Sequence, residues 1–295
     1  MRSQDMMDRE ELRDEIDVEV KRVSDLFRFI MKFKRHFQPS GVEFSGLRQY
    51  LPSDDASRID WKNSAGSDDL YVDQFEEEVD MDAFIVLDVS DSMIFGTADK
   101  LKSEYAAVVG AALAFASIDA GIDVGFGMWG EDSLIRNPSS TNSQYQRMLD
   151  ELSDPENYGG KFDLDRALTD VIGKIKEDTA IFIISDFINV KGDWKTKLTL
   201  SSMKFRHVMS VMVRDLRDYR MPENGNMRFE SPDGSGQIAL NTDVEAEEFN
   251  REAKRREEEM EEKLKGSGSS FLKIDTRDNF AAKFAEFFEE DEGSW

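Results

Sequence analysis

The fold of this chain is decided by one stretch, Phe84-Ile85-Val86-Leu87-Asp88-Val89-Ser90-Asp91-Ser92-Met93. Its first four residues are apolar, as in a buried strand, and the run then ends abruptly in a D-x-S-x-S turn. Such a turn brings the Asp88 carboxylate and the hydroxyls of Ser90 and Ser92 to one side of a tight loop. Hard divalent cations such as Mg²⁺, and also Mn²⁺ or Ca²⁺, prefer oxygen donors of this kind. The stretch therefore predicts a strand that ends in a metal site.

The sequence around this stretch alternates between strand and helix patterns from Met81 onward. We expect strands at 83–87, 123–129, 133–136, 180–185, 208–214 and 271–274, and helices at 100–118, 143–152, 164–176, 194–203 and 279–288. Because the strands are continuous apolar runs, the pattern predicts an α/β fold, a mostly parallel sheet with helices on both faces.

Three further segments complete the expected organisation. Residues 1–38 contain an amphipathic helix with a single apolar stripe, and residues 39–80 form a β-rich segment with short extended pieces at 47–51, 58–61 and 70–75. A β-hairpin at 224–241 and a charged helix at 245–265 are inserted before the last strand of the 81–295 domain. The basic, aromatic end of the first helix, 27–37, either packs on its own domain or contacts an anionic membrane or an acidic partner.

Composition excludes several classes of protein. The chain has 62 acidic against 38 basic residues, and its net charge of -24 disfavours nucleic acid as a partner. This acidity is either a salt-adapted surface or a field that steers a basic partner. The absence of cysteine excludes disulfides and thiolate metal sites. No apolar run approaches the roughly 20 residues of a transmembrane helix, and no signal peptide is evident, so we expect a cytoplasmic protein.

A second apolar strand also ends in an acidic residue, Asp186. In open α/β sheets, ligands bind beyond the carboxyl ends of the strands, so Asp88 and Asp186 would share one cation if their strands are neighbours. The loop Gly159-Gly160-Lys161-Phe162-Asp163-Leu164 is expected beside them. The alternative for each of these polar residues is a helix cap without a metal, and for Asp163 the two roles stay open.

Specific motifs in residues 41–93 indicate a family. They are Gly41-Val42-Glu43-Phe44-Ser45-Gly46-Leu47-Arg48-Gln49-Tyr50, Pro52-Ser53-Asp54-Asp55, Arg58-Ile59-Asp60-Trp61-Lys62, Ser64-Ala65, Leu70-Tyr71-Val72, Phe75-Glu76-Glu77-Glu78 and the D-x-S-x-S turn itself. Together they resemble the signature of the family called domain of unknown function 58 (DUF58), from about Gly41 to the last strand.

The resemblance implies a von Willebrand factor A-like, Rossmann-like domain that carries a metal-ion-dependent adhesion site. Asp88, Ser90 and Ser92 match its first metal loop, and Asp186 matches the third. The second loop departs from the pattern, because Phe162 stands where a threonine hydroxyl is usual; Asp163 or water would then supply the missing oxygen. Members of the family commonly accompany MoxR-type AAA+ ATPases in maturing or remodelling other proteins.

These features predict a non-enzymatic, divalent-metal-dependent protein-binding module whose partner offers a carboxylate to the metal. The alternative is a Mg²⁺-dependent phosphoryl-transfer enzyme of the haloacid-dehalogenase type, but that chemistry needs a second aspartate where Ser90 stands. No G-x-S-x-G elbow and no phosphate-binding G-x-x-x-x-G-K-[ST] loop occurs in the sequence. Arg48, Asp60, Trp61 and Lys62 form either a second partner surface or a buried ion pair packed by the tryptophan ring.

Overall fold

The structure is a computed structural model of the 295-residue chain. It describes residues 6–22, 43–51, 59, 61–64, 70–76, 81–188, 190–222, 225–230 and 236–290. The basic, aromatic segment 27–37 and the signature residues 52–58 lie outside these ranges. The chain divides into two compact units, Met1–Met31 with Met81–Trp295, and Lys32–Asp80.

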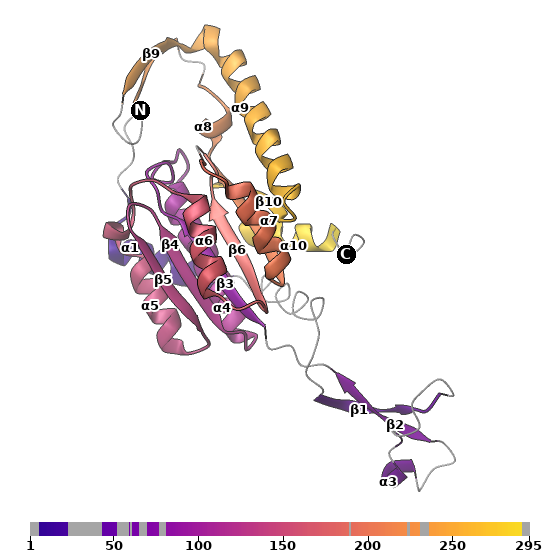
Figure 1. Ribbon diagram of the computed structural model, residues 1–295. Helices are drawn as coiled ribbons and strands as arrows, with labels where there is room; N and C mark the ends of the chain where they lie inside the picture. Colours follow the sequence, from indigo (N-terminus) through magenta and orange to yellow (C-terminus); the bar gives the residue numbers. More distant parts are fainter. Residues whose placement is uncertain are drawn as a thin grey trace. The chain divides into compact units, whose positions relative to one another are not determined.

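The larger unit is built on a six-stranded sheet with the strand order β10-β7-β6-β3-β4-β5 (Figure 1). All neighbouring strands run parallel except the edge pair β4 and β5, which is antiparallel. The strands are β3 (Asp82–Asp88), β4 (Val124–Trp129), β5 (Ser133–Ser139), β6 (Thr179–Ser185), β7 (His207–Arg214) and β10 (Ser270–Asp275). The predicted α/β class is confirmed, and the arrangement is consistent with a Rossmann-like fold of the von Willebrand factor A kind.

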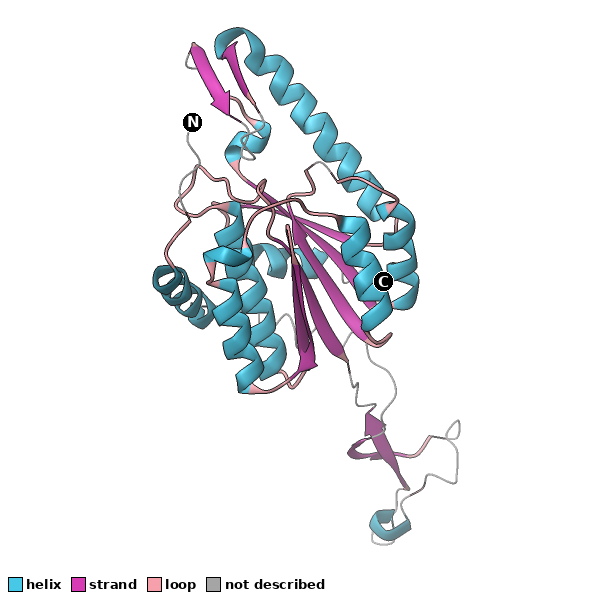
Figure 2. Ribbon diagram, turned by 60° about the vertical axis from the view of Figure 1, so that its left-hand side comes forward, coloured by secondary structure: helices cyan, strands magenta, loops and turns pink. Residues whose placement is uncertain are grey.

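Helices cover both faces of this sheet (Figure 2). One face carries α4 (Lys102–Asp119), with α1 (Arg9–Arg22), α5 (Asn142–Leu152) and α10 (Phe280–Glu290) around it; the other carries α6 (Leu164–Lys174), α7 (Trp194–Lys204) and the end of α9 (Thr242–Lys265). Alternate residues of β3 point to opposite faces: Ile85 lies against Gly110 of α4, whereas Val86 joins the core under α6 and α7. The central strands are therefore buried on both faces, which explains their continuous apolar sequence.

The element bounds differ from the sequence-based expectation mainly at two places. The edge strand β5 extends to Ser139, because it pairs with β4 on one side only and therefore tolerates Pro138. Helix α9 begins at Thr242, whose backbone and hydroxyl both donate to the Gly225 carbonyl. The predicted hairpin is present as the antiparallel pair β8 (Asn226–Glu230) and β9 (Gln237–Asn241), and the short helix α8 (Leu216–Tyr219), which was not predicted, precedes it.

The smaller unit contains an antiparallel pair, β1 (Glu43–Gln49) and β2 (Tyr71–Glu76), and the short helix α3 (Trp61–Ser64). Of the predicted extended piece at 58–61, Ile59 makes an isolated antiparallel bridge to Val72, whereas the prediction is wrong at Trp61, which begins the helix. The Trp61 side chain is 65% exposed, so it does not pack over a buried pair. Asp60 lies outside the described residues.

Candidate metal centre at the carboxyl edge of the sheet

The two predicted aspartates follow adjacent central strands. Strands β3 and β6 are paired with Leu87 opposite Ile184, so Asp88 and Asp186 end up at the same edge of the sheet. Both side chains are buried, with 1% of Asp88 and 0% of Asp186 exposed. The Ser185 hydroxyl, between them, donates to Asp88 Oδ2 at 2.6 Å. The prediction that these strands are central neighbours is confirmed.

The D-x-S-x-S loop folds back on its own aspartate. The Ser90 backbone N–H donates to Asp88 Oδ1 at 2.9 Å, which is the Asx turn typical of aspartate two residues before a turn. This turn places the Ser90 and Ser92 hydroxyl oxygens 3.1 Å apart. The loop thus gathers two hydroxyls close to a buried carboxylate.

The glycine loop lies beside the first loop, as the sequence indicated. Gly159 donates to the Val89 carbonyl at 2.7 Å, and its carbonyl would be 2.3 Å from a Cβ placed on Gly130, so that position needs glycine. Asp91 joins the two loops. It exchanges hydrogen bonds with Gly160, 2.9 Å each, through its backbone N–H and its Oδ1.

The second-loop candidates have other observed roles. The Asp163 side chain is exposed and accepts from the Arg166 backbone N–H at 3.0 Å, which makes it the N-cap of α6. Phe162, in the place of the usual threonine, is partly buried against the apolar core beneath α6 and α7. The cap is therefore observed for Asp163, and its role as a metal ligand stays a prediction.

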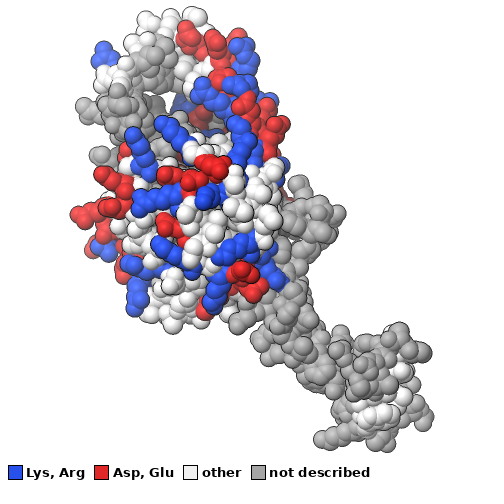
Figure 3. All heavy atoms as spheres, viewed as in Figure 1, with Lys and Arg blue, Asp and Glu red and all other residues white. Residues whose placement is uncertain are grey.

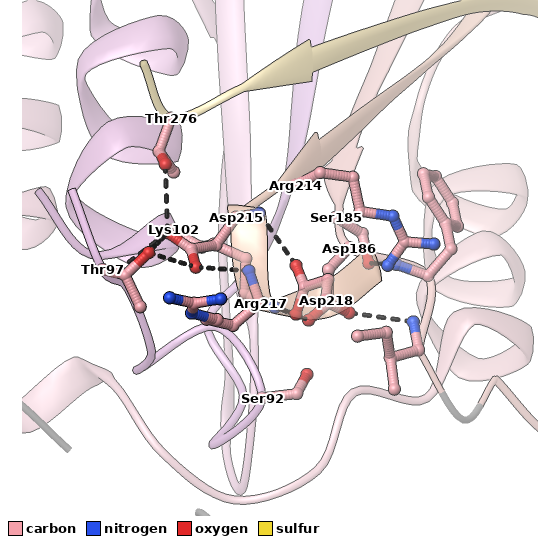
Figure 4. A network of polar contacts seen from close by, with 12 residues as sticks. Ser92, Thr97, Lys102, Ser185, Asp186, Arg214, Asp215, Arg217, Asp218 and Thr276 are labelled. Carbon is pink, nitrogen blue, oxygen red and sulfur yellow. Dashed lines mark hydrogen bonds and ion pairs between the residues drawn. The ribbon is translucent and has the colours of Figure 1, made fainter. Parts of the chain in front are cut away.

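A lysine that the sequence reasoning missed lies at the centre of the site. Lys102, at the start of α4, is 1% exposed. Its Nζ lies 2.8 Å from Asp186 Oδ2 and 3.0 Å from Asp218 Oδ1 (Figure 4). The other oxygen of Asp186 accepts from the Ile188 N–H at 2.8 Å, across Phe187, whose φ of 51° is unfavourable for a non-glycine residue. The fold thus holds Asp186 firmly at the cost of local backbone strain.

A third buried carboxylate, Asp215, joins the surrounding loops (Figure 4). It accepts from the backbone and the hydroxyl of Thr97, both at 2.8 Å, and from the Thr276 hydroxyl at 3.3 Å. It also caps α8 by accepting from the Arg217 N–H, while its own N–H donates to Asp218. The loops after β3, β7 and β10 therefore meet on one side chain, and Asp218 is fixed for its contact with Lys102.

The two aspartates of the site have opposite pKa shifts. Burial, and then the negative charge of Asp186, raise the pKa of Asp88 to about 7, although hydrogen bonds from Ser185 and Ser90 partly oppose this. Burial also acts against ionised Asp186, but the Lys102 ammonium more than offsets it and lowers the pKa of Asp186. For Lys102, burial favours the neutral amine, yet the two carboxylates raise its pKa. The ion pair is therefore ionised, whereas no described Lys or Arg side chain forms an ion pair with Asp88.

The residues of the first loop fit a hard divalent cation. Asp88, Ser90 and Ser92 offer three oxygen donors, and a cation beside Asp88 would offset the cost of ionising that buried carboxylate. Asp186 would add negative charge nearby, although both its oxygens already accept hydrogen bonds. Within the described ranges, no three His, Cys, Asp or Glu side chains are grouped to hold a metal, so hydroxyls would make up much of the donor set.

The sequence pattern gives only weak indications of the roles of Lys102, Asp215 and Asp218. Asp215-x-x-Asp218 after an apolar strand has the spacing of a capping box, and this was a detectable sign that β7 ends in a polar helix start. Lys102 stands in the first turn of an apolar helix, where a lysine is ordinarily solvated. Its burial depends on two carboxylates that lie 84 and 116 positions later in the chain.

The fold and the site define a Rossmann-like α/β protein with a polar, oxygen-rich centre at the carboxyl edge of its sheet. The chain belongs to the family described as "Protein of unknown function DUF58", whose model matches residues 46–259. It is similar to uncharacterized proteins of Mycobacterium bovis and Mycobacterium tuberculosis, with 26% identity over 252 residues, 84% of this chain and 78% of those proteins. The resemblance read from the signature motifs is thus confirmed at the level of the family.

Two solved structures from Bacteroides are similar to this chain at low identity. One is the conserved hypothetical protein BatB from Bacteroides thetaiotaomicron, with 16% identity, a TM-score of 0.45, and coverage of 72% of this chain and 100% of that one. The other is an aerotolerance-related membrane protein from Bacteroides fragilis, with 16% identity, a TM-score of 0.44, and coverage of 71% and 98%. In this chain, none of the described helices combines the length and apolarity that a membrane crossing requires.

Proposed function

We propose that this protein is a non-enzymatic, divalent-metal-dependent protein-binding module that works as an adaptor or co-chaperone with a MoxR-type AAA+ ATPase. One observation carries the proposal. The hydroxyls of Ser90 and Ser92 converge to 3.1 Å next to Asp88, a buried carboxylate that has no cationic partner among the residues that the structure describes. This is a donor set for a hard cation, and it lies at the strand ends where ligands bind in such sheets.

Asp88, Ser90 and Ser92 would hold Mg²⁺, or Mn²⁺ or Ca²⁺ in its place. A divalent ion bound by one carboxylate and two neutral hydroxyls keeps a net positive charge, which attracts an aspartate or glutamate of a protein partner. Asp186 stays close to this position and is already neutralised by Lys102. Because the site has hydroxyls where hydrolytic chemistry would need an acid or base, recognition is the function we favour over catalysis.

The surface charge is compatible with an acidic group approaching from solvent. Although the chain has a net charge of -24, the face seen in Figure 3 carries Lys and Arg side chains among the acidic ones. Along α9 they pair at helical spacing, as in Arg255 with Glu259 and Lys265 with Glu261. Mixed charges of this kind are screened within about 8 Å at physiological salt. A local cation would therefore dominate the field at the site.

The test has two arms that use the full-length protein. Calorimetric titration with Mg²⁺ should show binding that is lost in Asp88→Ala and retained in the exposed control Asp178→Ala. Immobilised protein should capture the MoxR-type ATPase of the same organism with Mg²⁺ and release it with EDTA, again with dependence on Asp88 and Asp186. If Asp88→Ala and Asp186→Ala both capture the ATPase as the unmodified protein does, with the same EDTA response, the proposed function is wrong.

A further inference from the structure

The site contains a positive charge that belongs to the chain itself. Lys102 Nζ lies 2.8 Å from Asp186 and 3.0 Å from Asp218, and its side chain is shielded from solvent almost completely. An ammonium buried to this extent is stable only when carboxylates surround it. In this arrangement Lys102 occupies one side of Asp186, the aspartate expected to serve a metal.

The backbone around Lys102 is also hydrogen-bonded to the segment that follows the D-x-S-x-S turn. The Lys102 backbone N–H donates to the Phe95 carbonyl, and the next residue, Ser103, donates to the Met93 carbonyl, both at 2.9 Å. The start of α4 is therefore hydrogen-bonded directly to the segment that follows Ser92. Any change in the charge balance of the site acts on an ammonium and a loop that are held together.

We propose that Lys102 is a built-in cation that competes with a divalent metal for Asp186 and so sets the metal affinity of the site. This inference rests on the proposed function and concerns the regulation of the same site. In the metal-free protein, Lys102 keeps Asp186 and Asp218 paired and the three loops assembled. A divalent ion at Asp88, Ser90 and Ser92 meets the repulsion of this ammonium and shares Asp186 with it, which weakens its binding.

The proposal predicts opposite effects of one substitution. Lys102→Met leaves Asp186 and Asp218 buried without the ammonium that they contact directly, so the metal-free protein loses thermal stability. The same change removes the competing charge, so Mg²⁺ should bind about tenfold more tightly, within the usual range of coupling between sites. A lysine with a purely structural role would produce the first effect without the second.

The experiment measures Mg²⁺ affinity by calorimetry in the unmodified protein, Lys102→Met, Asp186→Asn and the double variant. The tenfold gain should disappear when Asp186 is asparagine, so that the double variant and Asp186→Asn agree within about twofold. The double variant also removes both members of the closest ion pair, so it should be folded without metal. Lys102→Arg, which keeps the charge, is the matched control and should show no gain.

The outcomes separate the two proposals. If the unmodified protein binds Mg²⁺ and Lys102→Met binds it no more than about twofold better, competition by Lys102 is refuted while the metal site stands. If no variant binds millimolar Mg²⁺, the metal site itself is refuted. If Lys102→Met is unfolded in EDTA, recovery of its thermal transition by Mg²⁺ supports the proposal, and failure to recover beside a folded double variant overturns it.

Discussion

Asp88 and Asp186 are the same chemical group, equally buried, at the ends of neighbouring strands, yet their pKa values move in opposite directions. The pKa of Asp88 is raised to about 7 by burial and by the charge of Asp186. The pKa of Asp186 is lowered in spite of the same burial, because Lys102 lies 2.8 Å away. The comparison shows that one ammonium decides which aspartate of the pair is ionised, and that the other is the one in need of a cation.

The two aspartates differ in their local support as well. Asp88 accepts one hydrogen bond from the Ser90 backbone N–H of its own turn and one from the Ser185 hydroxyl at the end of the neighbouring strand β6. Asp186 depends on Lys102 of α4, and through it on Asp218 of the inserted α8. The half of the site around Asp88 is therefore supported by its own turn and the adjacent strand, and the half around Asp186 by side chains of α4 and α8.

Removing Lys102 should have the largest effect on stability, because Asp186 then lacks an adjacent ammonium, as Asp88 already does. In EDTA, Lys102→Met is expected to lower the free energy of unfolding by about 3–5 kcal/mol, the usual cost of leaving buried charges unpaired. Urea unfolding at neutral pH measures this. The exposed Lys174→Met, which removes only a surface pair with Asp170, should stay within about 0.5 kcal/mol. Similar losses for both lysines would contradict the account of the buried pair.

The pH dependence of stability should report the raised pKa of Asp88. Its folded-state pKa of about 7 lies above its ordinary value of 3.8, so the folded state binds the proton more tightly and metal-free stability is lost as the pH rises through 7. Between about pH 5 and pH 8 the unmodified protein should lose roughly 2–3 kcal/mol relative to Asp88→Asn.

Urea unfolding of both proteins in EDTA, at several pH values across this window, gives the difference directly. Other titrating groups cancel because they are common to the two proteins. Parallel stability curves would show that Asp88 is not the group that resists ionisation, and the contrast with Asp186 would be lost.

The next largest effect is expected from loss of the Asp215 carboxylate, which joins the loops after β3, β7 and β10. Asp215→Ala removes the acceptor of the Thr97 backbone and hydroxyl and of the Arg217 N–H, and is expected to cost about 2 kcal/mol. Because the Asp215 side chain caps α8, which carries Asp218, loss of the cap should also loosen Asp218 and make Lys102 more mobile, which amide hydrogen exchange across the start of α4 would detect. Unchanged exchange there would separate Asp215 from the Lys102 half of the site.

The smallest effect is expected at Asp163, an acidic residue of the second loop with a purely local contact. Asp163→Ala should cost about 1 kcal/mol through loss of the α6 cap, and Asp163→Ser should restore most of it. We expect the Mg²⁺ affinity in calorimetry to be unchanged. A clear loss of affinity in both variants would instead assign Asp163 to the metal, as the sequence pattern left open.

The sequence was sufficient for the features that depend on neighbours along the chain. The apolar run to Leu87 and the D-x-S-x-S turn predicted a buried strand and a loop of oxygen donors, and the pairing of Ser90 with Ser92 follows from that short spacing. Continuous apolar strands predicted a parallel sheet, and the end of the second strand led to Asp186. Such patterns are read from adjacent residues, because side chains in a strand alternate and a turn has a fixed geometry.

Only the tertiary structure decided the charge state of the site. Whether Lys102 is solvated or buried depends on which loops meet above the sheet, and its two contacts join residues 84 and 116 positions apart. Sequence spacing carries no information on such distances, since electrostatic energies depend on burial and on separation in space. The chain alone thus determined which oxygens are offered, and the fold determined which of them already have a positive partner.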